Sequence, residues 1–163
     1  LSTTQLAALT ATQIAGLTSS QLAAFSAAAA SGLTSAQISA LGADQLNSLS
    51  ATALAALSAT QLRGLTATQL DRLSTSAVAA LTATQVASLA ATQIASLSSE
   101  GLSALTATQA DALKTTQIAA LTTVQIEGLS ASDVADFDHA VCRALHHPDF
   151  GLGRHPGGRA YRH

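Results

Sequence analysis

Residues 1–136 repeat an eight-residue unit, which we call the octad, seventeen times without insertion or deletion. A typical copy is Leu9 to Gly16, LTATQIAG. The first position is leucine in every copy except at Phe25, and the sixth is Leu, Ile or Val except at Ala30 and Ala110. A continuous helix or coiled coil is excluded, because eight residues advance about 800° and rotate the apolar stripe by about 80° per octad. A strand is excluded because positions one and six would point to opposite faces.

Each octad contains the signals that begin a helix. Position two is Ser or Thr in fourteen copies, and position five is Gln in twelve. Together they form the capping box S/T-x-x-Q, in which the hydroxyl accepts a backbone N–H and the glutamine reaches back to the N-cap. The leucine before the cap and the aliphatic residue four positions after it have the spacing of a hydrophobic staple. The octad therefore predicts a helix that restarts in every copy.

The end of each helix is marked more weakly. Glycine occupies position eight at Gly16, Gly32, Gly64 and Gly128, where a left-handed C-terminal cap would favour it. Most other octads have Ala or Ser there, which indicates instead a tight turn without glycine. We expect helices of about five to seven residues, each followed at once by the next cap.

Helices this short are unstable alone, because nucleation is costly and few hydrogen bonds repay it. Neighbouring octads must bury their apolar positions against one another, as the units of a solenoid do. The predicted fold class is all-α: a solenoid or superhelix of short capped helices, one per octad, with positions one and six inside. Aromatic residues are only 2% of the chain, which favours a thin, elongated core. Two octads per coil would pair successive helices back to back, but the repeat does not fix that number.

The octad pattern dissolves after Leu129, and the chain divides there. Residues 1–136 form the predicted octapeptide-repeat solenoid. Ser130 and Asp133 give a last capping pair, and apolar residues at helical spacing predict one longer amphipathic helix over residues 130–147, which would close the open end of the solenoid. Residues 148–163 contain both prolines and no periodicity, and are predicted to be a disordered tail.

Charge and cysteine content narrow the functional classes. Only 10% of residues are charged, and no position of the octad is regularly basic, so no nucleic-acid footprint is present. No run of eighteen apolar residues predicts a membrane-spanning helix. The single cysteine, Cys142, excludes an internal disulfide framework. Without a carboxylate pair, a nucleophile–base arrangement or a phosphate-binding loop, we expect neither an enzyme nor a cofactor.

One group of side chains has the spacing of metal ligands. His139, Cys142 and His146 are three and four residues apart, which places them along one face of a helix and can suit a metal ion. A fourth ligand is not evident, and Cys142 can equally be a small buried residue of the C-terminal helix. We therefore predict no metal site and keep these three residues as weak candidates.

The octads LSTTQLAA, LTATQIAG, LTATQLDR and LTATQVAS resemble the L-[ST]-x-x-Q-[ILV]-x-x arrays of large, repetitive bacterial proteins. These are often grouped with adhesin-like or haem-utilisation surface proteins. The resemblance covers about residues 1–136 and is specific to the repeat rather than to an activity. It implies an extracellular or cell-surface spacer whose partners are other domains or repeats of a longer parent chain, and no catalytic residue carries over.

Three functions are consistent with these observations. The first is a non-catalytic spacer or stalk that holds other domains away from a surface. The second is a solenoid that binds a protein or glycan ligand on its concave face. The third is binding to ice through the regular threonines at positions two and four, although the position-two hydroxyls should already be engaged in caps.

Overall fold

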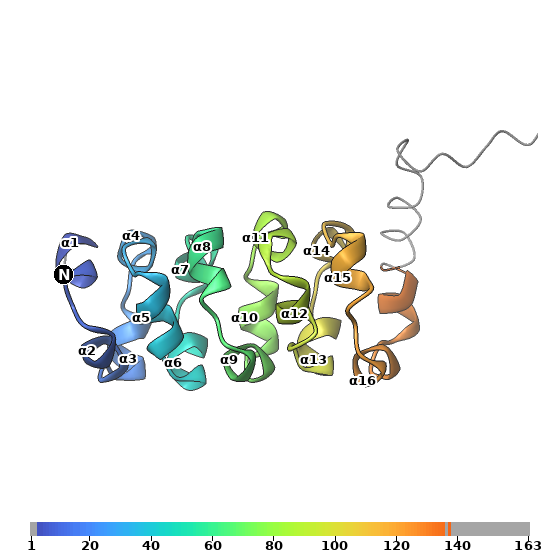
Figure 1. The fold of residues 1–163 in the computed structure, drawn as a ribbon, viewed down its shortest axis with the longest axis horizontal. Coiled ribbons are helices and arrows are strands. Elements are labelled where there is room, and N and C mark those ends of the chain that lie inside the picture. The colour runs from blue at the N-terminus through green and yellow to red at the C-terminus, as the bar shows by residue number, and fades with distance from the viewer. Residues whose placement is uncertain (1–2, 136, 138–163) are drawn as a thin grey trace, which may run out of the picture.

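The computed structural model describes residues 3–135 and 137 of the chain, and within them it is an all-α array of short helices (Figure 1). Sixteen helices follow one another, one per octad. They are α1 Thr3–Ala7, α2 Ala11–Ala15, α3 Ser19–Ala23, α4 Ala27–Ser31, α5 Ser35–Ala40, α6 Ala43–Asn47, α7 Ala51–Ala55, α8 Ala59–Arg63, α9 Ala67–Asp71, α10 Thr75–Ala79, α11 Ala83–Ser88, α12 Ala91–Ile94, α13 Ser99–Ser103, α14 Ala107–Asp111, α15 Thr115–Ile118 and α16 Thr123–Glu127. The predicted fold class is confirmed.

The capping box begins the helices as the sequence predicts. At α9, Thr66 has extended backbone angles, and its Oγ1 accepts the Gln69 backbone N–H at 3.3 Å. Gln69 Oε1 accepts the Thr66 backbone N–H in return, at 2.8 Å. Where position two has no hydroxyl, as at Ala90, the glutamine half remains, with Gln93 Oε1 accepting the Ala90 N–H at 3.0 Å. Each octad thus carries its own helix start.

Removing one cap should therefore cost stability locally. Thr66→Ala deletes the hydroxyl that accepts the Gln69 N–H, and should lower the free energy of unfolding by about 1 kcal/mol. Thr68→Ala, in the same helix, changes an exposed side chain and should stay within about 0.5 kcal/mol of the parent. Urea unfolding followed by circular dichroism compares the two, and equal losses would contradict the capping role.

The prediction of left-handed glycine caps is wrong. No described residue has a positive φ, and Gly16 has φ −79° and ψ −6°. Each helix instead tightens in its last turn: the Leu17 N–H donates to the Ile14 carbonyl three residues back, at 3.1 Å. Because this ending uses only right-handed and extended angles, any residue can stand at position eight. The helices are four to six residues long, so α12 and α15 are shorter than expected.

One coil of the solenoid takes between three and four octads. Helices three apart pack on each other, as in α1 with α4, α2 with α5 and α11 with α14. Side-chain hydrogen bonds between coils span 28 and 31 residues, and 28 residues are three and a half octads. A coil of two octads is therefore not formed. In Figure 1 the coils follow one another along the long axis, with α1 at one end and α16 at the other.

The core is one apolar column along the array. Position-six residues such as Leu62 and Ile94 have no exposed surface, and position-one residues such as Leu57 and Leu89 are at most a few per cent exposed. This confirms that positions one and six lie inside. The core also contains polar side chains that the sequence analysis placed only in caps. These are Gln37, Gln61, Gln69, Gln85, Gln93, Gln109, Gln117 and Gln125.

The predicted C-terminal helix is described only at its beginning. Residues 131–135 and 137 are helical, and Phe137 is buried against the core. The remainder of the predicted helix over residues 130–147, and the tail predicted over residues 148–163, lie outside the described residues.

Candidate functional site

The metal ligands proposed from the sequence are not placed by the structure. His139, Cys142 and His146 lie outside the described residues. Within residues 3–135 and 137, no group of three or more His, Cys, Asp or Glu side chains could hold a metal ion. The features available for function are therefore the buried glutamines, the outer surface and the ends of the array.

The position-five glutamines form a ladder that joins the coils. Gln69 Nε2 donates to the Ile38 carbonyl at 2.9 Å and to the Leu41 carbonyl at 2.7 Å, both in the preceding coil. Its Oε1 is meanwhile held by the Thr66 N–H. Nine described glutamines make such paired bonds to carbonyls 28 and 30 or 31 residues earlier: Gln37, Gln45, Gln61, Gln69, Gln85, Gln93, Gln109, Gln117 and Gln125.

Each amide of this ladder uses both of its ends. The oxygen completes the cap of its own helix, and the nitrogen satisfies buried carbonyls that would otherwise lack a donor. Sequence reasoning missed this second role. A signal was present, because a capping box accepts glutamate as readily as glutamine, yet glutamate never stands at position five. A carboxylate can complete the cap but cannot donate to a carbonyl.

The ladder is interrupted at regular intervals. Ala29, Ala53, Ala77 and Gly101 replace glutamine, and successive replacements are 24 residues apart. One gap is partly filled by a different side chain. Asn47 Oδ1 accepts the Ser74 N–H at 2.8 Å, a bond that glutamine at position 77 would otherwise provide. Asn47 Nδ2 also donates to the Arg72 carbonyl at 2.9 Å, so this asparagine joins two coils near the gap.

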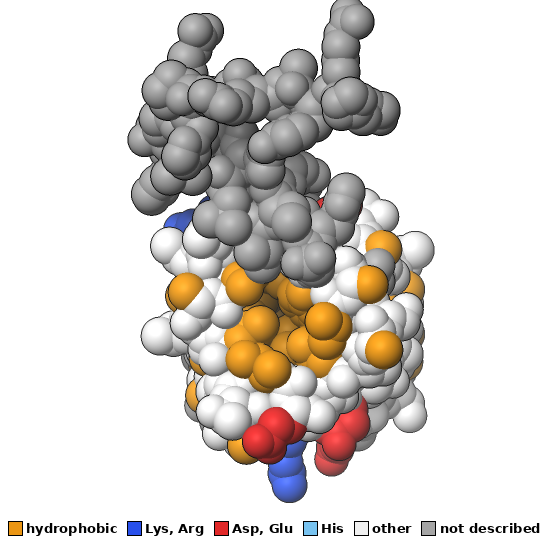
Figure 2. Space-filling model, turned by 90° about the vertical axis from the view of Figure 1, so that its right-hand side faces the viewer, with side chains coloured by type: hydrophobic (Ala, Val, Ile, Leu, Met, Phe, Trp, Pro, Cys, Tyr) orange, Lys and Arg blue, Asp and Glu red, His pale blue; other side chains and the backbone are white. Residues whose placement is uncertain are grey.

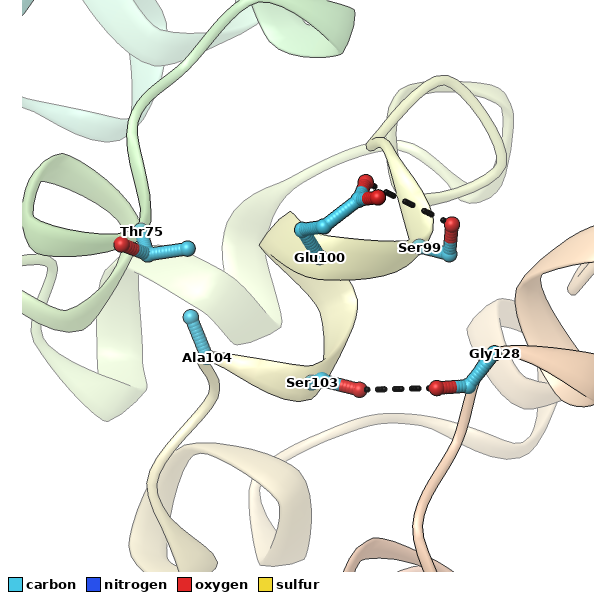
Figure 3. Close-up of a pocket in the computed structure, with 6 residues that line it drawn as sticks. All are labelled: Thr75, Ser99, Glu100, Ser103, Ala104 and Gly128. Carbon is cyan, nitrogen blue, oxygen red and sulfur yellow. Dashed lines mark hydrogen bonds between the residues drawn. The ribbon is translucent and has the colours of Figure 1, made fainter.

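A surface depression of about 500 Å³ crosses three successive coils, and its lining is shown in Figure 3. Thr75 comes from α10, Ser99, Glu100 and Ser103 come from α13, and Gly128 follows α16. Ser103 Oγ donates to the Gly128 carbonyl at 3.3 Å. The lining offers hydroxyls and one carboxylate but no described histidine or cation, so no nucleophile–base pair is assembled there.

Asp133 occupies position five after the last complete octad. Its Oδ2 accepts the Ser130 N–H at 2.8 Å and the Ser103 hydroxyl at 3.0 Å. The bonds from the Ser130 backbone and side chain, with a smaller contribution from Ser103, hold the pKa of the Asp133 carboxyl below its usual value. Asp133 therefore completes a cap as a carboxylate, and cannot donate to the carbonyls of the preceding coil.

The exposed surface is neutral and rich in hydroxyls. Position-four residues, among them Thr12, Thr60, Thr84 and Thr108, are exposed on the outside of the coils. The described charged residues are scattered over several octads rather than gathered on one position. None of the described helices is long and apolar enough to cross a membrane.

Comparison with known proteins adds no relative. No protein-family model matches the chain, and neither a curated protein nor a solved structure matches it. The resemblance to bacterial octapeptide arrays therefore rests on the repeat itself: helices that recur every eight residues, with glutamines buried at the same spacing.

Proposed function

We propose that this chain is a non-catalytic structural repeat, a spacer or stalk within a larger bacterial surface or secreted protein. The observation that carries the proposal is the continuity of the apolar column and the glutamine ladder from the first coil to the last. Every coil is joined to the next by the same bonds, so the array forms one elongated body (Figure 1). Such a body holds whatever is attached to its ends at a fixed separation.

The composition of the outer surface supports the same proposal. A binding solenoid normally varies at the surface positions that meet its ligand. The exposed positions here carry small residues and hydroxyls over most of the array. The extracellular location and the attachment to other domains are inferred from the resemblance alone and remain predictions.

Ice binding is less well supported than the spacer. The exposed threonines of position four occur once per octad, and a coil takes three to four octads. Successive threonines therefore face different directions around the array, whereas an ice-binding surface requires many of them in one plane. A thermal-hysteresis measurement tests this alternative directly.

Small-angle X-ray scattering of a lengthened array tests the spacer. A variant that duplicates residues 57–80 gains three octads and keeps the 24-residue spacing of the ladder gaps. We expect its maximum dimension to increase while its cross-sectional radius stays that of the parent. A control with 24 Gly and Ser residues at the same site should instead give the scattering of a flexible insertion. A wider cross-section, or no increase in length, would contradict a rigid spacer.

A further inference from the structure

The contact between coils has two unlike sides. The side toward the N-terminus presents the Nε2 donors of position five, and the side toward the C-terminus presents carbonyls together with position-six side chains. The first coil shows the second of these sides covered. Leu6, Ile14 and Leu22 have no exposed surface, because the following coil packs over them. The two ends of the array are therefore the two halves of one interface.

The N-terminal end face, which we define as Leu9, Gln13, Leu17 and Gln21, presents the donor half. The Oε1 atoms of Gln13 and Gln21 accept the N–H groups of their N-caps at 2.8 Å, so both side chains are already oriented. Both are exposed, and no acceptor for their Nε2 lies among the described residues. Leu9 and Leu17 are partly buried, unlike the position-one leucines farther along.

The C-terminal end face, which we define as Ile118, Leu121, Ile126, Leu129 and Val134, presents the other half. Ile126 is 54% exposed and Val134 is 50% exposed, although position six is covered in the first coil. No described glutamine donates to the carbonyls of Ile118 and Leu121. Seen end on, the array shows an apolar, hollowed patch ringed by polar atoms, beside residues that are not described (Figure 2).

We propose that a second copy of this chain docks end to end, its N-terminal end face on the C-terminal end face of the first. The contact repeats the one found between coils inside the chain, with Gln13 and Gln21 donating to backbone carbonyls and leucines covering the exposed isoleucine and valine. No charge opposes it, because the first charged residue is Asp44, while the C-terminal end face lies near Glu127 and Asp133. The interface is heterologous and does not close, so association continues into filaments.

Two variants of the full chain each block one end. Gln13→Glu with Gln21→Glu keeps both caps, since glutamate also serves in a capping box, but replaces the donors by carboxylates. Ile126→Asp places a charge in the apolar patch. Analytical ultracentrifugation should show concentration-dependent association of the parent, weakened at least about tenfold in either variant. Thr60→Asp, exposed at mid-array, is the matched control and should associate like the parent.

Mixing the two variants gives the sharpest result. Each retains the end that the other lacks, so an equimolar mixture should form dimers that grow no further. Circular dichroism of each variant confirms that the helices are retained. A parent that stays monomeric at high concentration, or a Gln13→Glu/Gln21→Glu variant that associates like the parent, would overturn the proposal. Neither outcome affects the spacer, whose test concerns the length of one chain.

Discussion

Replacing Gln69 by glutamate should lower the free energy of unfolding by about 3–5 kcal/mol at neutral pH, the cost of an uncompensated buried charge. Gln69 is 4% exposed, and its Nε2 donates to the Ile38 and Leu41 carbonyls. Glutamate keeps the cap, because its carboxylate still accepts the Thr66 N–H. It loses both donors, however, and directs a negative charge at two carbonyl oxygens.

The same variant should become more stable in acid relative to the parent. Burial beside carbonyl oxygens raises the pKa of a glutamate in the folded state above its unfolded value of about 4.3. Below that value both states are protonated, and the deficit is small. As the pH rises toward the folded-state pKa, only the unfolded state releases its proton, so stability falls. Urea unfolding of variant and parent between pH 4 and pH 8 measures the difference.

Gln13→Glu is the matched control for Gln69→Glu. Gln13 makes the same cap, with Thr10, but belongs to the first coil and has no preceding coil to bond. Its side chain is exposed, so the substitution should change the free energy of unfolding by no more than about 0.5 kcal/mol, with little dependence on pH. Equal losses at the two positions would mean that the glutamines act only as caps.

The second prediction is that one substitution, Gly→Ala, has opposite signs at two octads. Gly16 and Gly64 have similar right-handed backbone angles, which alanine adopts freely. A Cβ on Gly16 would meet only ordinary contacts, so Gly16→Ala should stabilise by about 0.4–1 kcal/mol. A Cβ on Gly64 would lie 2.7 Å from the Ser35 carbonyl oxygen and 2.9 Å from Ser35 Cβ. Gly64→Ala should therefore destabilise by about 1–3 kcal/mol.

Chemical denaturation of both glycine variants checks the signs. The physical reason is the spacing of the coils: Gly64 contacts a residue 29 positions earlier, in the preceding coil, whereas Gly16 has no preceding coil. The C-terminal glycine Gly128 meets Ser99 in the same way, its added Cβ lying 2.6 Å from Ser99 Cβ. Stabilisation at both Gly16 and Gly64 would show that the coils can separate without cost.

The local structure of this fold could be predicted because its signals lie within one octad. Cap, staple and apolar positions are all read within a few residues, and the structure has each of them, as at Thr66 and Gln69. The end of the helix was predicted wrongly because glycine at position eight has a reason other than backbone angle. Gly32, Gly64 and Gly128 each face Thr or Ser at position three of an earlier coil, and glycine leaves room for that side chain.

The size of the coil could not be predicted from the octad, because it depends on contacts about 28 residues apart. Two long-range signals were nevertheless present in the sequence. One is the pairing of glycine at position eight with a larger position-three residue 29 positions earlier, and the other is the return of the ladder gaps every 24 residues. For the site, the candidates His139, Cys142 and His146 lie outside the described residues, so that hypothesis stands as it was.

The interrupted ladder has a consequence for the array under tension. Each glutamine joins only adjacent coils, so a pulling force applied along the axis passes through the coil contacts in series. The coils that lack glutamine at Ala53, Ala77 and Gly101 hold their neighbours with fewer hydrogen bonds and should part first. The array would then lengthen in discrete steps and recoil as the bonds re-form. A chain whose octads were all identical would have no such points of yielding, and no preferred place to begin.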